Sequence, residues 1–222
     1  MFSVHIAVAP ETLDMLTAEL WEAGTLGIVE GPGYLEAFFD DFATAARFGS
    51  PAEAADTDWV KATQEAWPPL LVGEKFFVVA PWRTEATPPG RFRLEINPGV
   101  QCGTGQHPCT QLCLQALERL IRPGDRVLDV GTGSGILSIA AKMLGASQVI
   151  ACDIDPDAER AVPFFVGSVD AVRGGAFDVV VANISDIVIG ELKPEFNRVA
   201  PRRILSGFQN ERGDWDCLVE SD

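Results

Sequence analysis

A glycine-rich loop between an apolar strand and a helix constrains this chain more than any other part of its sequence. The loop reads DVGTGSG over residues 129–135, after the Val-rich run RVLDV and before the helical pattern ILSIAAKMLG. Glycines there let the backbone turn sharply and let a ligand approach closer than a Cβ would allow. The N-terminus of the following helix favours a negatively charged group on that ligand. The segment therefore predicts a ligand-binding turn in a parallel α/β sheet.

An acid at the end of the next strand indicates the class of ligand. Asp153 closes the strand QVIACDI, where its carboxylate can accept both hydroxyls of an adenosine ribose. The spacing G-x-G-x-G after Asp129 differs from the G-x-G-x-x-G of dinucleotide sites. We expect S-adenosylmethionine, which has no pyrophosphate for the loop to bind. A nicotinamide or flavin site and a purely structural turn are the alternatives.

Short apolar segments around this loop are typical of strands that helices cover on both faces. The predicted sheet uses RVLDV, QVIACDI, FFVGS, FDVVVANI and RRILSG. Upstream, the alternating run FSVHIAV, a helix from Glu11 to Ala23, the strands LGIVE and YLEAFF and the helical DFATAARF predict a β-α-β-β-α unit. We expect a small N-terminal α+β domain at 1–55, a linker helix at 56–70 and an α/β domain at 71–222.

Two connections are shorter than such a sheet requires. Only residues 156–163 separate the strand that ends at Asp155 from the one that begins at Phe164, whereas a parallel crossover takes about a dozen residues or more. After RRILSG, residues 207–210 begin a stretch without room for a further helix and strand before the last one. We hypothesise that disordered segments are absent from this sequence, which an intact mass of 23.9 kDa would refute.

Charge and cysteine content limit the classes of partner. The chain has 32 acidic and 17 basic residues, a net charge of −15 that disfavours nucleic acid and membranes and favours a basic partner. No apolar run reaches the roughly 18 residues of a membrane helix, and the N-terminus lacks a secretory pattern. The five cysteines form no CxxC pair, which fits reduced thiols rather than disulfides or zinc. We expect a cytoplasmic monomer without a metal.

Two further segments bring polar side chains to the expected carboxyl edge of the sheet. A glycine-rich loop from Asn97 to Thr110 contains His107 and leads into the helix QLCLQALERL. The buried strand FDVVVANI ends at Asn183, at the edge where open α/β sheets bind ligands. Helix capping by His107 and strand capping by Asn183 are the structural alternatives. We expect Asn183 to be functional because its strand lies beside the glycine loop.

The motifs DVGTGSG, CDID and VVVANI resemble those of class I S-adenosylmethionine-dependent methyltransferases, which have a Rossmann-like sheet. A narrower resemblance, from DWVKATQEAWPPLLVGEKFFVVAPW through NPGVQCGTGQHPCT to NI, is to bacterial methyltransferases of ribosomal protein L11 and covers nearly the whole chain. It implies methyl transfer to amino groups of that basic protein, with the N-terminal domain as its recognition domain. It also implies cofactor contacts at Thr110, Gly131, Asp153 and Asn183, with His107 and Gly133 as neighbours.

Four departures from the family pattern concern the acceptor more than the cofactor. Asn97 replaces an Asp, Cys109 replaces a Thr, and Thr132 replaces a Cys or Gly. The segment after Asn183 reads ISDIVIGEL, where the family commonly has LAGPL after the first hydrophobic residue.

Methyl transfer to nitrogen is an in-line displacement that needs positioning more than acid or base catalysis. The acceptor amine must be neutral, so the site must lower its pKa from about 10.4 by desolvation and by accepting its hydrogens. The side chain of Asn183 and the carbonyl of Ile184 are suited to that task. Two alternatives stay open: a methyltransferase of another protein or a small molecule, and a cofactor-binding relic without an acceptor site.

Overall fold

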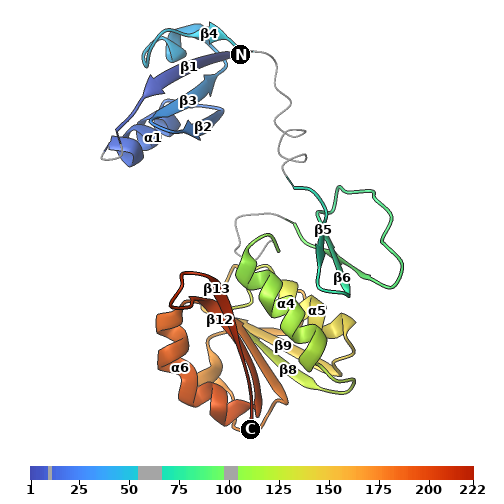
Figure 1. Cartoon of the computed structure of the whole chain (residues 1–222). Coiled ribbons are helices and arrows are strands. Elements are labelled where there is room, and N and C mark those ends of the chain that lie inside the picture. Colours follow the sequence, from blue (N-terminus) through green and yellow to red (C-terminus); the bar gives the residue numbers. More distant parts are fainter. Residues whose placement is uncertain (10–11, 55–66, 98–104) are drawn as a thin grey trace. The chain divides into compact units, whose positions relative to one another are not determined.

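The chain divides into two compact units, Met1–Glu65 and Ala66–Asp222, and each has its own apolar core. The computed structural model describes residues 1–9, 12–54, 67–97 and 105–222 (Figure 1). Most of the linker helix expected at 56–70 therefore lies outside the described residues. None of the helices in these ranges is long and apolar enough to cross a membrane.

The first unit is a four-stranded antiparallel sheet with the strand order β2-β3-β1-β4. Its elements are β1 (Phe2–Ala7), α1 (Leu13–Glu22), β2 (Gly27–Gly31), β3 (Tyr34–Phe39), α2 (Phe42–Ala45) and β4 (Ala52–Glu53). Val4 of β1, Leu20 of α1 and Leu35 of β3 are buried together in its core. The predicted β-α-β-β-α order is confirmed, and β4 adds a short edge strand beside β1.

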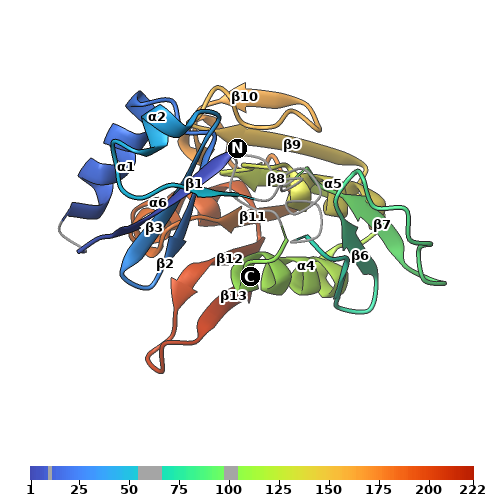
Figure 2. The ribbon, with the colours of Figure 1, turned by 90° about the horizontal axis from the view of Figure 1, so that it is seen from above.

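The second unit is built on a six-stranded sheet with the order β10-β9-β8-β11-β12-β13, which Figure 2 shows from one edge to the other. The strands are β8 (Arg126–Val130), β9 (Gln148–Asp153), β10 (Phe164–Val166), β11 (Val179–Asn183), β12 (Arg202–Gln209) and β13 (Trp215–Ser221). Five strands run parallel, and β13 pairs antiparallel with β12. The five strands that the sequence predicted for the parallel sheet are confirmed.

Helices cover both faces of this sheet, because alternate strand residues point to opposite sides. The helices are α4 (Pro108–Leu120), α5 (Ile136–Met143) and α6 (Asp186–Val199). Figure 1 shows α4 and α5 on one face and α6 on the other. The core cluster on the side of α4 and α5 contains Val127, Val179 and Ile204. The cluster on the side of α6 contains their sequence neighbours Leu128, Val180 and Leu205. This arrangement is the Rossmann-like α/β fold that the sequence predicts.

The connection from β9 to β10 contains no helix. Residues 154–163 instead return across the glycine loop, where the N–H of Glu159 donates a hydrogen bond to the carbonyl of Gly133 at 2.9 Å. The space that a Cβ on Gly135 would fill lies 3.2 Å from the Cβ of Ala161. A short segment thus covers the outside of the loop where a crossover helix would otherwise begin.

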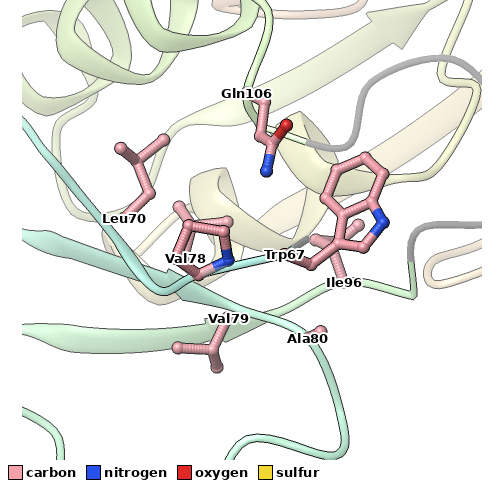
Figure 3. Close-up of a pocket in the computed structure, with 8 residues that line it drawn as sticks. Trp67, Leu70, Val78, Val79, Ala80, Ile96 and Gln106 are labelled. Carbon is pink, nitrogen blue, oxygen red and sulfur yellow. The ribbon is translucent and has the colours of Figure 1, made fainter. Parts of the chain in front are cut away.

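A three-stranded sheet precedes α4 in the chain and comprises β5 (Leu70–Val72), β6 (Phe76–Val79) and β7 (Phe92–Glu95). The sequence predicts β6 and β7 but not β5. Beside this sheet, Trp67 and Gln106 line a small apolar pocket with Val78 and Ile96 (Figure 3). Its volume of about 20 Å³ is too small for a cofactor. The pocket is therefore not the cofactor site.

Candidate functional site

A cavity of about 480 Å³ opens at the carboxyl ends of β8, β9 and β11. This volume lies in the range of small-molecule and cofactor sites, and the carboxyl edge is where open α/β sheets bind ligands. The residues around it come from the glycine loop, from the ends of β9 and β11, and from the turn after β10. They include Gly131, Gly133, Asp153, Gly167, Asn183 and Ile184.

The glycine loop adopts a backbone that side chains disfavour. Gly131, Gly133 and Gly135 have φ angles of 71°, 51° and 74°, all in the left-handed region. Gly135 is also the N-cap residue of α5. The space of a Cβ at Gly131 is taken by Ile184, whose Cγ2 would lie within 2.4 Å of it. Glycine is therefore required at Gly131 both by the backbone and by Ile184, the residue that follows β11.

The side chain of Asp129 connects the glycine loop to α5. Its Oδ2 accepts hydrogen bonds from the hydroxyls of Thr132 at 2.8 Å and Ser138 at 2.6 Å, which ties the loop to α5. The carboxyl group is fully buried, and burial raises its pKa above the ordinary value of 3.8. Its other oxygen, Oδ1, is buried without a hydrogen-bond partner among the described residues. Thr132, a departure from the family pattern, thus has a structural partner in Asp129.

Asp153 has two backbone partners at the end of β9. Its Oδ2 accepts from the N–H of Gly133 at 3.0 Å, and its Oδ1 accepts from the N–H of Asp155 at 3.1 Å. A carboxylate offers about four lone-pair positions, so about two stay open for a ligand in the cavity that Asp153 lines. The same side chain therefore fixes the loop and presents acceptor capacity to the cavity.

The N-terminus of α4 meets the end of β11. The amide Nδ2 of Asn183 donates to the hydroxyl of Thr110 across 3.2 Å, and Thr110 is buried. His107 is the N-cap residue of α4, and its Nδ1 accepts from the N–H of Cys109 at 3.3 Å. The His107 ring also packs edge-on against Trp215, with 4.5 Å between ring centroids. The structural alternative for His107, helix capping, is thus what the structure contains.

The structure brings together most of the residues that the sequence singled out. Gly131, Gly133, Asp153, Asn183 and Ile184 line one cavity. Thr110 joins them through its hydrogen bond to Asn183, while His107 is not among the described residues that line the cavity. Residues 98–104 of the loop before α4 lie outside the described residues.

Sequence reasoning missed other residues of the site. Gly167 and Ser168 line the cavity directly after β10, and the rule that ligands bind at the carboxyl ends of strands is the signal that could have found them. Ile154 is 81% exposed and Val188 is 37% exposed, and together they give the cavity an apolar wall suited to a flat ring. Gly207 of β12 touches the Ile184 peptide, and no sequence signal indicated it.

The cysteines of the described chain carry free thiols. They are Cys109, Cys113, Cys152 and Cys217, and the first three are buried. Burial raises the pKa of Cys152 to about 12, so this thiol stays protonated at neutral pH. Cys102 lies outside the described residues. Within the described ranges, no group of three or more His, Cys, Asp or Glu side chains is placed to hold a metal ion.

A family model and two curated relatives indicate the same protein family for this chain. Residues 40–214 match the family model of ribosomal protein L11 methyltransferase. A relative of that name from Geobacter sulfurreducens is 37% identical, and the match covers 94% of this chain and 83% of the relative. Another, from Burkholderia cenocepacia, is 44% identical over 60% of this chain and 47% of the relative. The matched part of the chain thus spans about half the length of the Burkholderia relative.

A solved structure supports the same family, and the alignment with the Geobacter relative shows a difference in length. The crystal structure of ribosomal protein L11 methylase from Lactobacillus delbrueckii subsp. bulgaricus matches with a TM-score of 0.56 and 29% identity, over 64% of this chain and 80% of that chain. The alignment with the Geobacter relative extends over 254 residues, which exceeds the 222 of this chain. That relative therefore contains residues that have no counterpart here.

Proposed function

The chain belongs to the ribosomal protein L11 methyltransferase family, and on that premise we propose that it transfers methyl groups from S-adenosylmethionine to amino groups of ribosomal protein L11. The observation that carries the proposal is a single cavity that two chemically different groups line together. Gly131, Gly133 and Asp153 offer backbone and carboxylate contacts for a nucleoside cofactor, and Asn183 and Ile184 line the same cavity with an amide and a backbone carbonyl. A nucleoside cofactor bound there would present its reactive group to an acceptor beside Asn183.

The lining of the cavity fits S-adenosylmethionine better than a dinucleotide. Asp153 and Asp155 line it, and among the described lining residues there is no Lys or Arg to pair with a pyrophosphate. Asp153 keeps acceptor positions for two ribose hydroxyls, and the glycine loop leaves the backbone close to the cavity. When bound, S-adenosylmethionine supplies an activated methyl group on a positively charged sulfur. An acidic lining tolerates that charge.

Asn183 and Ile184 offer two oxygen acceptors that would orient a neutral amine. Because Nδ2 of Asn183 donates to Thr110, its Oδ1 is the atom that can accept a hydrogen from an amine. The carbonyl of Ile184 is the second acceptor in our proposal. Two acceptors favour the neutral amine with its lone pair directed at the methyl group, and desolvation in the cavity lowers the pKa of the amine. Asn183 and Ile184 thus act by positioning, as an in-line displacement requires.

The first unit is the proposed recognition domain for the protein substrate. It has its own core and sheet, so it can present a surface independent of the cofactor cavity. The net charge of −15 favours a basic partner. Because its substrate is a ribosomal protein, we place the enzyme in the cytoplasm.

One experiment separates this function from its rivals. The full chain is incubated with methyl-labelled S-adenosylmethionine and total ribosomal protein, and mass spectrometry identifies the labelled band. The proposal predicts label on L11 for the wild type and for Asn197→Ala, which alters an exposed side chain of α6, and little label for Asn183→Ala. Cofactor binding by calorimetry without label on any protein would instead indicate a relic or a small-molecule acceptor.

A further inference from the structure

Gly207 of β12 lies directly against the backbone of Ile184. A Cβ built on Gly207 would lie 1.8 Å from the carbonyl oxygen of Ile184, 2.6 Å from its carbonyl carbon and 3.0 Å from its nitrogen. These atoms belong to the backbone, so they cannot rotate away as a side chain can. The φ angle of Gly207 is +115°, which also favours glycine. The chain can place the Ile184 carbonyl there only because residue 207 has no side chain.

A break in the strand pairing brings Gly207 to this position. The register between β12 and β13 shifts between Ser206 and Phe208, so Gly207 sits at a β-bulge. Bulges are frequent beside active sites, where they redirect the backbone. The carbonyl of Ser206 still accepts from the N–H of Ile184 at 3.0 Å, as in a regular parallel ladder. The backbone of Ile184 is therefore held at its nitrogen by the hydrogen bond to Ser206, and its carbonyl oxygen lies in the space that a side chain on Gly207 would need.

The side chain of Ile184 is fixed by a second glycine. Its Cγ2 occupies the space of a Cβ on Gly131, at 2.4 Å. Gly131 belongs to the glycine loop and Gly207 to β12, so Ile184 lies between two elements that both lack a side chain at the contact. The side chain of Ile184 thus contacts the glycine loop while its carbonyl lies against β12.

We propose that Gly207 is a positioning residue for methyl transfer, because it lets the Ile184 carbonyl stand where the acceptor amine needs a hydrogen-bond acceptor. This proposal rests on the proposed function. In the step that it serves, the lone pair of the amine nitrogen forms the new N–C bond while the S–C bond breaks and its electron pair stays on sulfur. The methylated ammonium product then releases a proton to water. Gly207 touches neither substrate and acts only through Ile184.

Substitution of Gly207 by alanine tests the proposal, with Gly213→Ala as the matched control. Gly213 lies in the turn of the same hairpin and also has a positive φ, +82°, but a Cβ there meets nothing within 4 Å. Both variants force alanine into a left-handed backbone, and only Gly207→Ala pushes on Ile184. The Ile184 oxygen would have to move by about 1 Å, and a misplacement of that size can lower a rate by about 100-fold.

The expected result is a split between turnover and binding. The kcat for L11 methylation should fall by about 100-fold in Gly207→Ala and by no more than about threefold in Gly213→Ala. The Kd of S-adenosylmethionine, measured by calorimetry, should stay within about threefold in both, because Asp153 and the glycine loop are untouched. Equal kcat in the two variants would overturn the proposal. So would a loss of cofactor affinity as large as the loss of kcat, since Gly207 would then serve the fold alone.

A measurement on the wild type keeps the proposal testable if Gly207→Ala does not fold. Ile184 is the only Ile followed by Ser in the chain, so ¹³C-carbonyl isoleucine with ¹⁵N-serine gives one correlated NMR signal for its carbonyl. With S-adenosylhomocysteine bound, added L11 should shift this ¹³C resonance. An unchanged resonance at saturating L11 would overturn the proposal. A wild type that transfers no methyl group would contradict the proposed function instead, so the two failures are distinct.

Discussion

The side-chain amide of Asn183 donates a hydrogen bond to the hydroxyl of Thr110 across 3.2 Å, and so joins the end of β11 to the first turn of α4. The two residues are far apart in the sequence, and the strand order brings β11 beside β8 and its glycine loop. The bond has a chemical consequence. It engages the NH₂ group of Asn183 with the protein and leaves its carbonyl oxygen able to accept a hydrogen bond, which the proposed function assigns to the acceptor amine.

Replacement of Thr110 by valine should therefore impair methyl transfer more than it impairs folding. Valine keeps the shape but removes the hydroxyl, so the free energy of unfolding should fall by about 1 kcal/mol. The kcat should fall by about tenfold or more because Asn183 loses its orientation. Steady-state kinetics and chemical denaturation measure the two effects. Thr110→Ser, which keeps the hydroxyl, should restore most of the rate, and a Ser variant as slow as the Val variant would contradict this role.

Asp153 provides the sharpest test of the cofactor assignment. Asp153→Ala should weaken S-adenosylmethionine binding by at least about tenfold, because one charge-assisted hydrogen bond contributes about 1.5 to 3 kcal/mol. The matched control is Asp157→Ala, which removes an equal charge outside the cavity lining. Calorimetry should show no NAD binding to the wild type. A wild type that binds NAD and ignores S-adenosylmethionine would show that the cofactor is wrong.

The buried carboxyl of Asp129 predicts a pH dependence of stability. Burial raises its pKa in the folded state above 3.8, so the folded protein holds this proton more tightly than the unfolded chain does. The contribution of this group to stability is therefore greatest below pH 3.8 and declines as the pH rises through the folded pKa. Asp129→Asn removes this decline and keeps an oxygen for Thr132 and Ser138.

The measurement is the free energy of unfolding of wild type and Asp129→Asn across the acidic range. The advantage of the variant should grow as the pH rises above about 4 and become constant once Asp129 is ionised in the folded protein. The exposed Asp157→Asn serves as the reference for the loss of one surface carboxylate. A variant whose advantage shrinks as the pH rises would contradict the sign of this shift.

The parallel sheet was predictable because its strands are buried on both faces and appear in the sequence as continuous apolar runs. Asp153 and Asn183 were predictable because each ends such a run, and the carboxyl ends of neighbouring parallel strands meet at one edge. The three-residue strand β5 gave no comparable signal. Its pairing with β6, which places Leu71 opposite Phe77, depends on tertiary contacts and not on the local sequence.

Helix α6 shows a second limit of sequence reasoning. Pro194 lies inside it, and an internal proline normally argues against a helix because its ring clashes with the carbonyl four residues earlier. The residue four positions earlier is Gly190. The helix nevertheless continues past Pro194 to Val199. The contact of Gly207 with Ile184 could not be predicted either, because it depends on a β-bulge that only the pairing of β12 with β13 reveals.

Removal of the first unit tests the proposed division of labour between the two units. Deletion of residues 1–55 should leave the Kd of S-adenosylmethionine within about twofold, because the cavity lies wholly in the second unit. Methylation of L11 should fall by about 100-fold or more, since the effective concentration of the acceptor amine collapses. Circular dichroism verifies that the truncated chain is folded. A truncated protein that methylates L11 at the full-length rate would show that the first unit does not recruit it.

The intact mass of purified L11 after incubation with the full chain and S-adenosylmethionine tests the central claim most directly. The account predicts that the mass of L11 rises by whole methyl increments, that peptide mapping places them on amino groups, and that Asn183→Ala slows the rise by about 100-fold while Asn197→Ala does not. An L11 mass that stays unchanged, in the presence of an enzyme that calorimetry shows to be saturated with S-adenosylmethionine, would contradict it.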